Sequence, residues 1–196
     1  MVAVVTALRP TRGGVAVDLD GVTWRTFAVA VVVEAGLGVG LELDRPQARA
    51  LARARRRHRA EQVAVRALSR REHSRRSLDM RLERAGVGDT VRADVLQRAE
   101  RGGLVDDQRF AERRARQLAE RGAGDLLIVD DLVRQGLDEA VARTAVSDLQ
   151  TEAERASAIV ERRGRSARTL RYLAARGFSD DSLEPLIADI GSGALR

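Results

Sequence analysis

The sequence predicts a mainly α-helical protein: three tandem three-helix repeats in an elongated curved array, preceded by a small β-rich module. Three observations carry this prediction. Glycines recur where short helices should end, apolar residues recur at four-residue spacing before them, and only the first part of the 196-residue chain is valine-rich with hairpin signals. We expect the β-rich module over residues 1–44, a basic helix and the first repeat over 45–103, the second repeat over 104–150 and the third over 151–196.

The N-terminal module contains three stretches typical of strands. Residues 2–8 and 14–20 are rich in valine, and the Asp20-Gly21 dipeptide leads into a third stretch, residues 22–27. Asp-Gly is a strong signal for a tight turn between antiparallel strands. We therefore expect a hairpin or a three-stranded sheet.

The segment that follows, residues 28–34, is compatible with a further strand or with a short helix before Gly36, and we favour the helix. Trp24 and Phe27 are the large aromatic residues of the module. We expect both to pack in its core and not to act as a base-stacking platform.

A long basic helix is predicted next, because Asp44 suits an N-cap, Pro46 suits the first turn, and nothing breaks a helix from Arg45 to about Arg71. From Arg45 to Arg76 there are twelve arginines against two acids, although the whole chain carries only +6. Such concentrated charge predicts a polyanionic partner, either nucleic acid or an acidic protein surface; a solvated face is the alternative. The arginines that recur at spacings of three and four are Arg45, Arg49, Arg53, Arg56 and Arg57.

After this helix, candidate N-cap residues and helix-ending glycines recur at regular intervals. The candidate N-caps are Ser74, Asp89, Asp106, Asp125, Asp138, Ser166 and Ser179. The glycines placed to end helices are Gly86, Gly102, Gly122, Gly136, Gly164, Gly177 and Gly191. We therefore expect short helices joined by tight links.

Alignment of the glycines shows an internal repeat with the character of a helix-turn-helix. The three copies are Leu78-x3-Leu82-x3-Gly86-Val87, Ile128-x3-Leu132-x3-Gly136-Leu137 and Thr169-x3-Leu173-x3-Gly177-Phe178, the last closed by Leu186 and Ile187. Preceding helices near residues 45–73, 107–121 and 151–163 complete each unit. Such units bury their apolar faces on their neighbours, and the extended surface suits a macromolecular partner better than a small substrate.

Catalytic and metal sites find little support. The chain has no cysteine and no lysine, which excludes thiol nucleophiles, thiolate metal sites and Schiff-base chemistry. His58 and His73 lie about 22 Å apart if they share one helix, too far to share a metal ion. Asp106 and Asp107 follow two glycines and open a helix, so we interpret them as capping and not as an acid/base pair. We expect no cofactor, no metal and no enzymatic activity.

Membrane and export functions are also not expected. The longest apolar run, residues 27–33, is far shorter than a membrane-spanning helix, and the start of the chain lacks the basic-then-apolar order of a secretory signal. We expect a cytoplasmic protein. Sequence-specific DNA reading is disfavoured because two of the three second helices begin with acids, whereas binding to the DNA backbone stays open.

Three stretches in combination resemble the RecX family of bacterial regulatory proteins. They are Ala67-Leu-Ser-Arg-Arg-Glu-His-Ser-Arg-Arg76 followed by Leu78-x3-Leu82-x3-Gly86, Gly103-Leu-Val-Asp-Asp-Gln-Arg-Phe-Ala111, and Leu173-Ala-Ala-Arg-Gly-Phe-Ser179. The resemblance runs from about Val65 to Ile190; residues 1–60 resemble only longer members with an extra N-terminal module.

The resemblance implies three-helix repeats that bind the RecA recombinase in the groove of its filament on single-stranded DNA and restrain filament growth, ATP hydrolysis, strand exchange and coprotease activity in the SOS response. The contact candidates for RecA or DNA are Arg49, Arg53, Arg56, Arg57, Arg70, Arg71, Arg75 and Arg76. The motif positions expected to be structural are His73, Ser74, Asp106, Asp107, Arg109, Phe110, Gly86, Gly136 and Gly177.

Two departures from the family pattern stand out. Ser77 occupies the position where an acid usually completes a capping box with Ser74, which predicts a weaker cap. The helix after Gly124 is acidic where the family is usually basic, which puts a filament contact through residues 125–135 in doubt. The principal hypothesis is a RecA-filament inhibitor, and the alternative is a DNA-backbone-binding architectural protein that acts without RecA.

Overall fold

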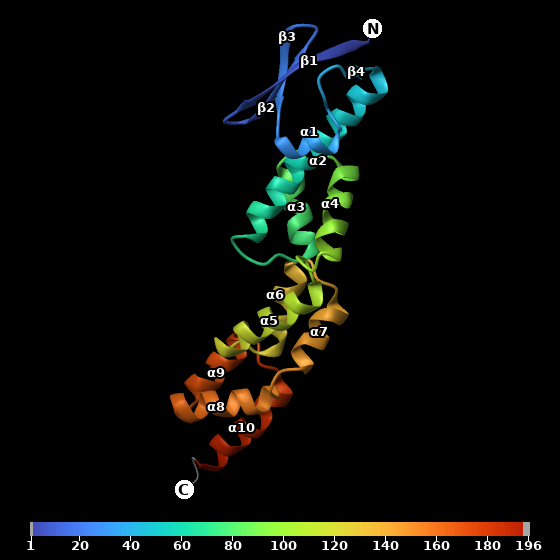
Figure 1. The fold of residues 1–196 in the computed structure, drawn as a ribbon. Helices are drawn as coiled ribbons and strands as arrows, with labels where there is room; N and C mark the ends of the chain where they lie inside the picture. Colours follow the sequence, from blue (N-terminus) through green and yellow to red (C-terminus); the bar gives the residue numbers. More distant parts are fainter. Residues whose placement is uncertain (1, 194–196) are drawn as a thin grey trace. The chain divides into compact units, whose positions relative to one another are not determined.

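The computed structural model describes residues 2–193 and is mainly helical, with a small antiparallel sheet at the N-terminal end (Figure 1). Its contacts divide the chain into two compact units. The first unit comprises the chain up to Arg71 together with Asp79–Ala99, and the second comprises Glu72–Leu78 and the chain from Glu100 onward. In the described part of the chain, no helix is long and apolar enough to cross a membrane.

The predicted sheet is present, with one strand that the sequence did not suggest. Strands β1 (Ala3–Thr11), β2 (Gly14–Leu19) and β3 (Val22–Phe27) pair antiparallel, and the short β4 (Glu42–Leu43) adds to the free edge of β1. The order in the sheet is β3-β2-β1-β4.

The turn between β2 and β3 has the geometry that its sequence predicts. Asp20 and Gly21 both have positive φ, 49° and 83°, as a two-residue type I′ turn requires. The Asp20 carboxylate also accepts a hydrogen bond from the Val4 amide at 2.9 Å, which ties the turn to β1. The next segment forms a helix, α1 (Val29–Glu34), as expected.

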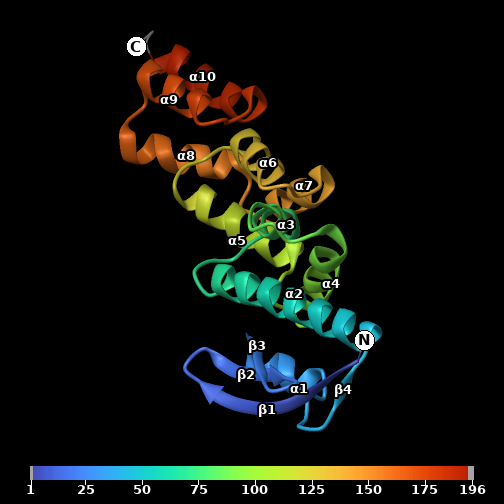
Figure 2. The ribbon, with the colours of Figure 1, turned by 90° about the horizontal axis from the view of Figure 1, so that it is seen from above.

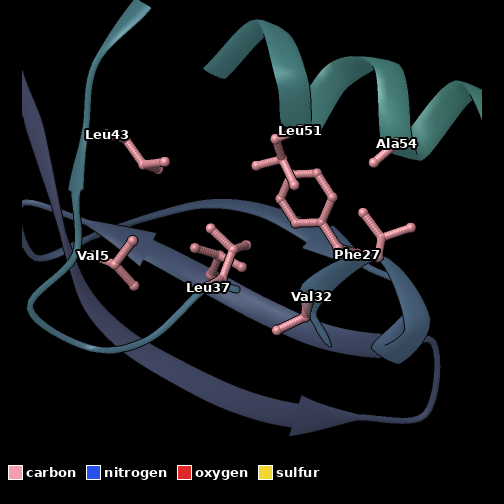
Figure 3. Close-up of a cluster of buried hydrophobic side chains, with 9 residues drawn as sticks. Val5, Phe27, Val32, Leu37, Leu43, Leu51 and Ala54 are labelled. Carbon is pink, nitrogen blue, oxygen red and sulfur yellow. The ribbon is translucent and has the colours of Figure 1, made fainter. Parts of the chain in front are cut away.

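The core of this module lies between the sheet, α1 and the start of α2 (Arg45–Leu68). Figure 3 shows Leu51 and Ala54 on α2 pointing toward Phe27, with Val5 and Leu43 from the strands on the other side. Burial of these apolar side chains is the main force that holds α2 against the sheet.

Trp24 is not a core residue, contrary to the prediction. Its side chain remains 39% exposed, and its ring packs on the edge of the core with its centre 5.3 Å from that of Phe27. The strand β3 lies at the edge of the sheet and is exposed along most of its length. Only Phe27, at its end, is buried.

Helix α2 begins where its sequence predicts and ends earlier than expected. Asp44 caps it with a capping box, in which the Asp44 carboxylate accepts from the Gln47 amide at 2.7 Å and the Gln47 side chain accepts from the Asp44 amide. The helix stops at Leu68 and not near residue 73. The prediction that His58 and His73 share one helix is therefore wrong: His58 is on α2, whereas His73 belongs to the loop before the next helix.

Eight further helices within the described residues match the predicted repeats. Helices α3 (Arg75–Arg84) and α4 (Asp89–Arg101) contribute residues to both compact units. Figures 1 and 2 show the other helices in the second unit. These are α5 (Asp107–Glu120), α6 (Asp125–Arg134), α7 (Glu139–Ser147), α8 (Glu152–Arg163), α9 (Ala167–Ala175) and α10 (Asp180–Gly193).

The repeated glycines end helices as predicted. Gly86, Gly136 and Gly177 have φ of 73°, 85° and 79°, a left-handed conformation that favours glycine. After each glycine, the amide of the following residue donates to the carbonyl five positions back, as in the Schellman motif; the bond from Leu137 to Leu132 is 3.2 Å long. The residues four and eight positions before each glycine are buried: Leu78, Leu82, Ile128, Leu132, Thr169 and Leu173.

Three details differ from the prediction. Helix α10 continues through Gly191, which therefore does not end a helix as predicted. Ile187 is 53% exposed and does not close the third repeat, which Leu183 and Leu186 do. Asp89 and Asp125, both predicted as N-caps, are instead the first residues of α4 and α6, and the N-cap of α6 is Gly124.

Candidate polyanion-binding interface

Four arginines of α2 form an exposed row. At 100° per residue, Arg45, Arg49, Arg53 and Arg56 share the helix side opposite Leu51 and Ala54, which are buried in the core of the module. Among the side chains that the structure describes, no carboxylate lies within 4.0 Å of any of the four. Their positive charge is therefore not neutralised within the described chain, and it is available to a polyanion.

Arg57 lies next to this row but has structural partners. Its guanidinium forms ion pairs with Glu34 of α1 and with Asp94 of α4, the latter at 3.1 Å, and its side chain is 30% exposed. It thereby connects three helices of the first unit. Of the predicted contact residues on α2, it is the one whose charge is already compensated.

The arginines of the family motif fall into two kinds of environment. Arg70 and Arg71 follow the end of α2 and are exposed, and no ion pair joins either of them to a described carboxylate. Arg75 pairs with Glu100 at 2.7 Å. The stem of Arg76 covers Gly136, where an added Cβ would lie 2.3 Å from the Arg76 Cδ. These two arginines support the second unit whether or not they also contact a partner.

The motif residues expected to be structural have clear structural contacts. His73 and Ser74 are buried; the Ser74 hydroxyl accepts from the Ser77 amide at 3.1 Å and donates to the Gln135 carbonyl at 2.6 Å. His73 Nδ1 lies 2.8 Å from the Ser77 hydroxyl. The loop before α3 is thereby fixed to the turn that ends α6.

The two aspartates cap different helices. Asp106 caps its own helix, α5, by accepting from the Arg109 amide at 3.0 Å. Asp107 instead accepts from the Arg75 amide at 2.7 Å, at the start of α3. Ser77 stands where the family usually has an acid, so α3 lacks that carboxylate in its own first turn. Asp107, from the next repeat, provides a carboxylate there instead. Both roles agree with the capping interpretation.

Arg109 and Phe110 complete this structural group. The Arg109 guanidinium donates to the Gly103 carbonyl at 2.8 Å and thereby closes the loop before α5. Phe110 is half-buried and packs against the core of the second repeat.

The acidic helix α6 has an internal explanation. Asp131 accepts two hydrogen bonds from Arg114 of α5, at 2.8 and 3.0 Å, and Asp125 pairs with Arg155 of α8. Asp130 pairs with Arg134 of its own helix. Each of its acids therefore neutralises an arginine of the second unit, and the loss of positive charge here is compatible with a purely structural helix.

The buried cluster around Glu152 was not predicted from the sequence. One carboxylate oxygen accepts from the Asp125 amide at 2.6 Å, at the start of α6. The other accepts from the Ser179 amide at 3.1 Å and from the hydroxyls of Ser179 and Ser182, at the start of α10. A single acid thus caps two helices of different repeats. An acid in the first turn of α8 looks like an ordinary helix preference, so no local signal distinguishes it.

Arg155 completes this cluster. It is nearly buried, donates to the Ala123 carbonyl at 2.7 Å and pairs with Asp125, while its guanidinium lies 5.8 Å from the centre of the Phe178 ring. Arg155 therefore bonds both the Ala123 backbone carbonyl, just before α6, and the Asp125 side chain at the start of α6.

The environment shifts the pKa of both acids. Burial by itself raises the pKa of Glu152, but the hydrogen bonds from Ser179, Ser182 and two backbone amides outweigh it and leave the pKa below its usual value. The pKa of Asp125 is raised, mainly by burial and also by the nearby Glu152, although Arg155 opposes the shift.

Two glycines allow the second and third repeats to approach closely. The Gly124 amide donates to the Arg176 carbonyl at 2.8 Å, and a Cβ on Gly124 would lie 2.3 Å from the Gly177 carbonyl. The Arg176 guanidinium donates to the carbonyls of Gly122 and Arg121, at 3.1 and 2.9 Å, and so caps the end of α5. The contact between the repeats is therefore made by backbone atoms, and a side chain larger than glycine at position 124 would clash.

Comparison with known proteins gives a consistent result. No family model matches the sequence. The chain is 33% identical over 136 residues to the regulatory protein RecX of Halorhodospira halophila, covering 64% of this chain and 84% of that protein. It is 35% identical over 146 residues to the regulatory protein RecX of Acidithiobacillus ferrooxidans, covering 68% and 90%. A crystal structure of a regulatory protein RecX superposes with a TM-score of 0.77 at 21% identity, over 95% of this chain and 99% of that one.

Proposed function

Because the chain belongs to the RecX family of regulatory proteins, we propose that it is a negative regulator of the RecA recombinase. It binds the RecA filament on single-stranded DNA and restrains ATP hydrolysis, strand exchange and coprotease activity, in the cytoplasm and without catalysis of its own. The observation that carries this proposal is the row of exposed arginines on α2, which no described carboxylate neutralises.

Charge complementarity supports a filament as the partner. Arg49, Arg53 and Arg56 present guanidinium groups at successive turns of one helix side, a spacing of about 5–6 Å that suits phosphates or surface carboxylates. Arg70 and Arg71 add two further exposed charges in the same unit. The row presents a positively charged surface to the partner. The neighbouring Arg57 has a structural role instead, because its ion pairs with Glu34 and Asp94 connect α2 to α1 and α4.

The experiment is a titration of the chain into the single-strand-DNA-dependent ATPase assay of RecA from the same organism. We expect strong inhibition well below one protein per RecA. The double variant Arg49→Ala/Arg53→Ala should weaken inhibition about tenfold. The matched control, Arg134→Ala/Arg143→Ala, removes the same charge from exposed positions of α6 and α7 and should inhibit like the wild type.

The alternative is a protein that binds the DNA backbone without RecA, and the same arginine row favours it. No inhibition up to parity with RecA, together with tight and salt-sensitive binding to naked DNA, would establish this alternative. Full inhibition by Arg49→Ala/Arg53→Ala would show that the α2 row is not the contact surface.

A further inference from the structure

A second basic surface lies on the third repeat, outside every segment used above for the proposed function. Residues 161–176, from the end of α8 through α9, contain six arginines and a single acid, Glu161. Arg162, Arg163, Arg168 and Arg171 are exposed. Within the described part of the chain, no carboxylate lies within 4.0 Å of these four guanidinium groups.

The surface is hollowed along its length. A hollow of about 490 Å³ between the end of α5 and α8 includes Arg116, Leu149 and Arg162 in its lining. A second, of about 300 Å³, shares Arg162 and continues to Arg163 and Tyr172. A third, of about 360 Å³, shares Arg163 and reaches Arg168. The shared residues make the three hollows adjoin one another in a row.

The three adjoining hollows are lined by arginines, by an aromatic ring and by apolar side chains. The Arg163 guanidinium stacks on Tyr172, 3.9 Å from the ring centre, and Arg163 remains exposed. Stacked in this way, the guanidinium is held flat and offers a second plane to a base. Ala119, Leu149 and Ile159 supply apolar lining between the arginines. The acids in the lining are Glu120 and Asp148, fewer than the arginines.

We propose that this α8–α9 surface is a second, independent site that binds the phosphate backbone of a nucleic-acid single strand. Arg162, Arg163 and Arg168 contact successive phosphates, and a base stacks on the outer plane of Arg163. A single strand fits better than a duplex because its unpaired bases reach the stacking plane and the apolar lining, whereas a duplex offers mainly phosphates.

The test uses the full chain without RecA and measures the anisotropy of a fluorescent oligothymidylate of about 15 nucleotides over a range of salt concentrations. Arg163→Ala/Arg168→Ala should weaken binding about tenfold and reduce the salt slope by about 1.4, since each phosphate contact on a single strand contributes about 0.7. The control Arg134→Ala/Arg143→Ala should bind within about twofold of the wild type. Equal effects of the two double variants, or no binding of the oligonucleotide by the wild type, would overturn the proposal.

Two further arms remove ambiguities. Arg168→Ala/Arg171→Ala leaves the Arg163–Tyr172 stack intact, so a loss of binding in this variant does not arise from altered packing. A polyglutamate of matched charge that competes as well as the oligonucleotide would show that the surface takes acidic protein segments instead, which contradicts the proposal. The RecA ATPase titration is read separately: inhibition that persists while oligonucleotide binding is absent overturns only this inference, whereas binding without inhibition overturns only the proposed function.

Discussion

The carboxylate of Asp107 accepts a hydrogen bond from the backbone amide of Arg75 at 2.7 Å, although the two residues are 32 positions apart. Asp107 lies in the first turn of α5 and Arg75 is the first residue of α3. Two of the family-motif stretches therefore meet in one helix cap. This contact explains why an Asp-Asp pair follows the glycines: one acid caps its own helix, and the other caps the helix of the preceding repeat.

Removal of the Asp107 cap should destabilise the fold. We expect Asp107→Ala to lower the free energy of unfolding by about 1 kcal/mol, the usual cost of a lost N-cap. Asp107→Asn retains an acceptor and should lose less. Urea unfolding followed by circular dichroism measures both. Equal stability of Asp107→Ala and the wild type would contradict the capping role.

Glu152 should matter more, because it is buried and caps two helices. We expect Glu152→Ala to cost about 3 kcal/mol, since its loss leaves the amides of Asp125 and Ser179 without their acceptor. Thr151 is exposed and caps α8 alone. Thr151→Ala therefore serves as the comparison and should cost about 1 kcal/mol.

The same acid should give the fold a specific pH dependence. The pKa of Glu152 is lowered on folding, so its stabilisation is present above its unfolded pKa of about 4.3 and is lost as the pH falls through the folded pKa. Asp125 acts in the opposite sense, because its folded pKa is raised and its protonation relieves a cost. Unfolding of Glu152→Gln between about pH 3 and 6 should show a shallower loss of stability than the wild type. An unchanged profile would mean that Glu152 does not govern this transition.

The close approach of Gly124 and Gly177 predicts intolerance to a single methyl group. Gly124→Ala places a Cβ 2.3 Å from the backbone of Gly177 and should cost about 2 kcal/mol or more. Gly88→Ala is the matched control, because an added Cβ there meets no atom within 4 Å and the φ is not left-handed. A thermal melt of both variants distinguishes a steric cost from a general effect of glycine replacement.

Arg56 and Arg57 are neighbours in the sequence that should behave differently. Arg57→Ala breaks two ion pairs and should lower stability by about 1 kcal/mol, because each partly exposed pair contributes only modestly. Arg56→Ala should leave the melting temperature unchanged and weaken inhibition of RecA. The reverse pattern in the two assays would show that Arg57, and not the exposed row, forms the contact.

Much of the fold could be predicted from local signals. The I′ turn at Asp20 and Gly21, the cap at Asp44 and the glycine turns at Gly86 and Gly136 are determined by residues that lie within a few positions of one another. The buried positions of the repeats follow from four-residue spacing in the same way. The exposed Trp24 could not be predicted, because its burial depends on which strand forms the edge of the sheet.

The candidate interface was predictable only in part. The sequence by itself determined that arginine is concentrated between residues 45 and 76 and that the chain lacks cysteine and lysine, because these are matters of composition. Only the tertiary structure decided that Arg57 is compensated whereas Arg56 is not, that Asp107 caps a distant helix and that Glu152 joins two repeats. Each of these depends on a partner 23 to 37 positions away. Contacts at such separations are set by how helices pack, which local spacing does not encode.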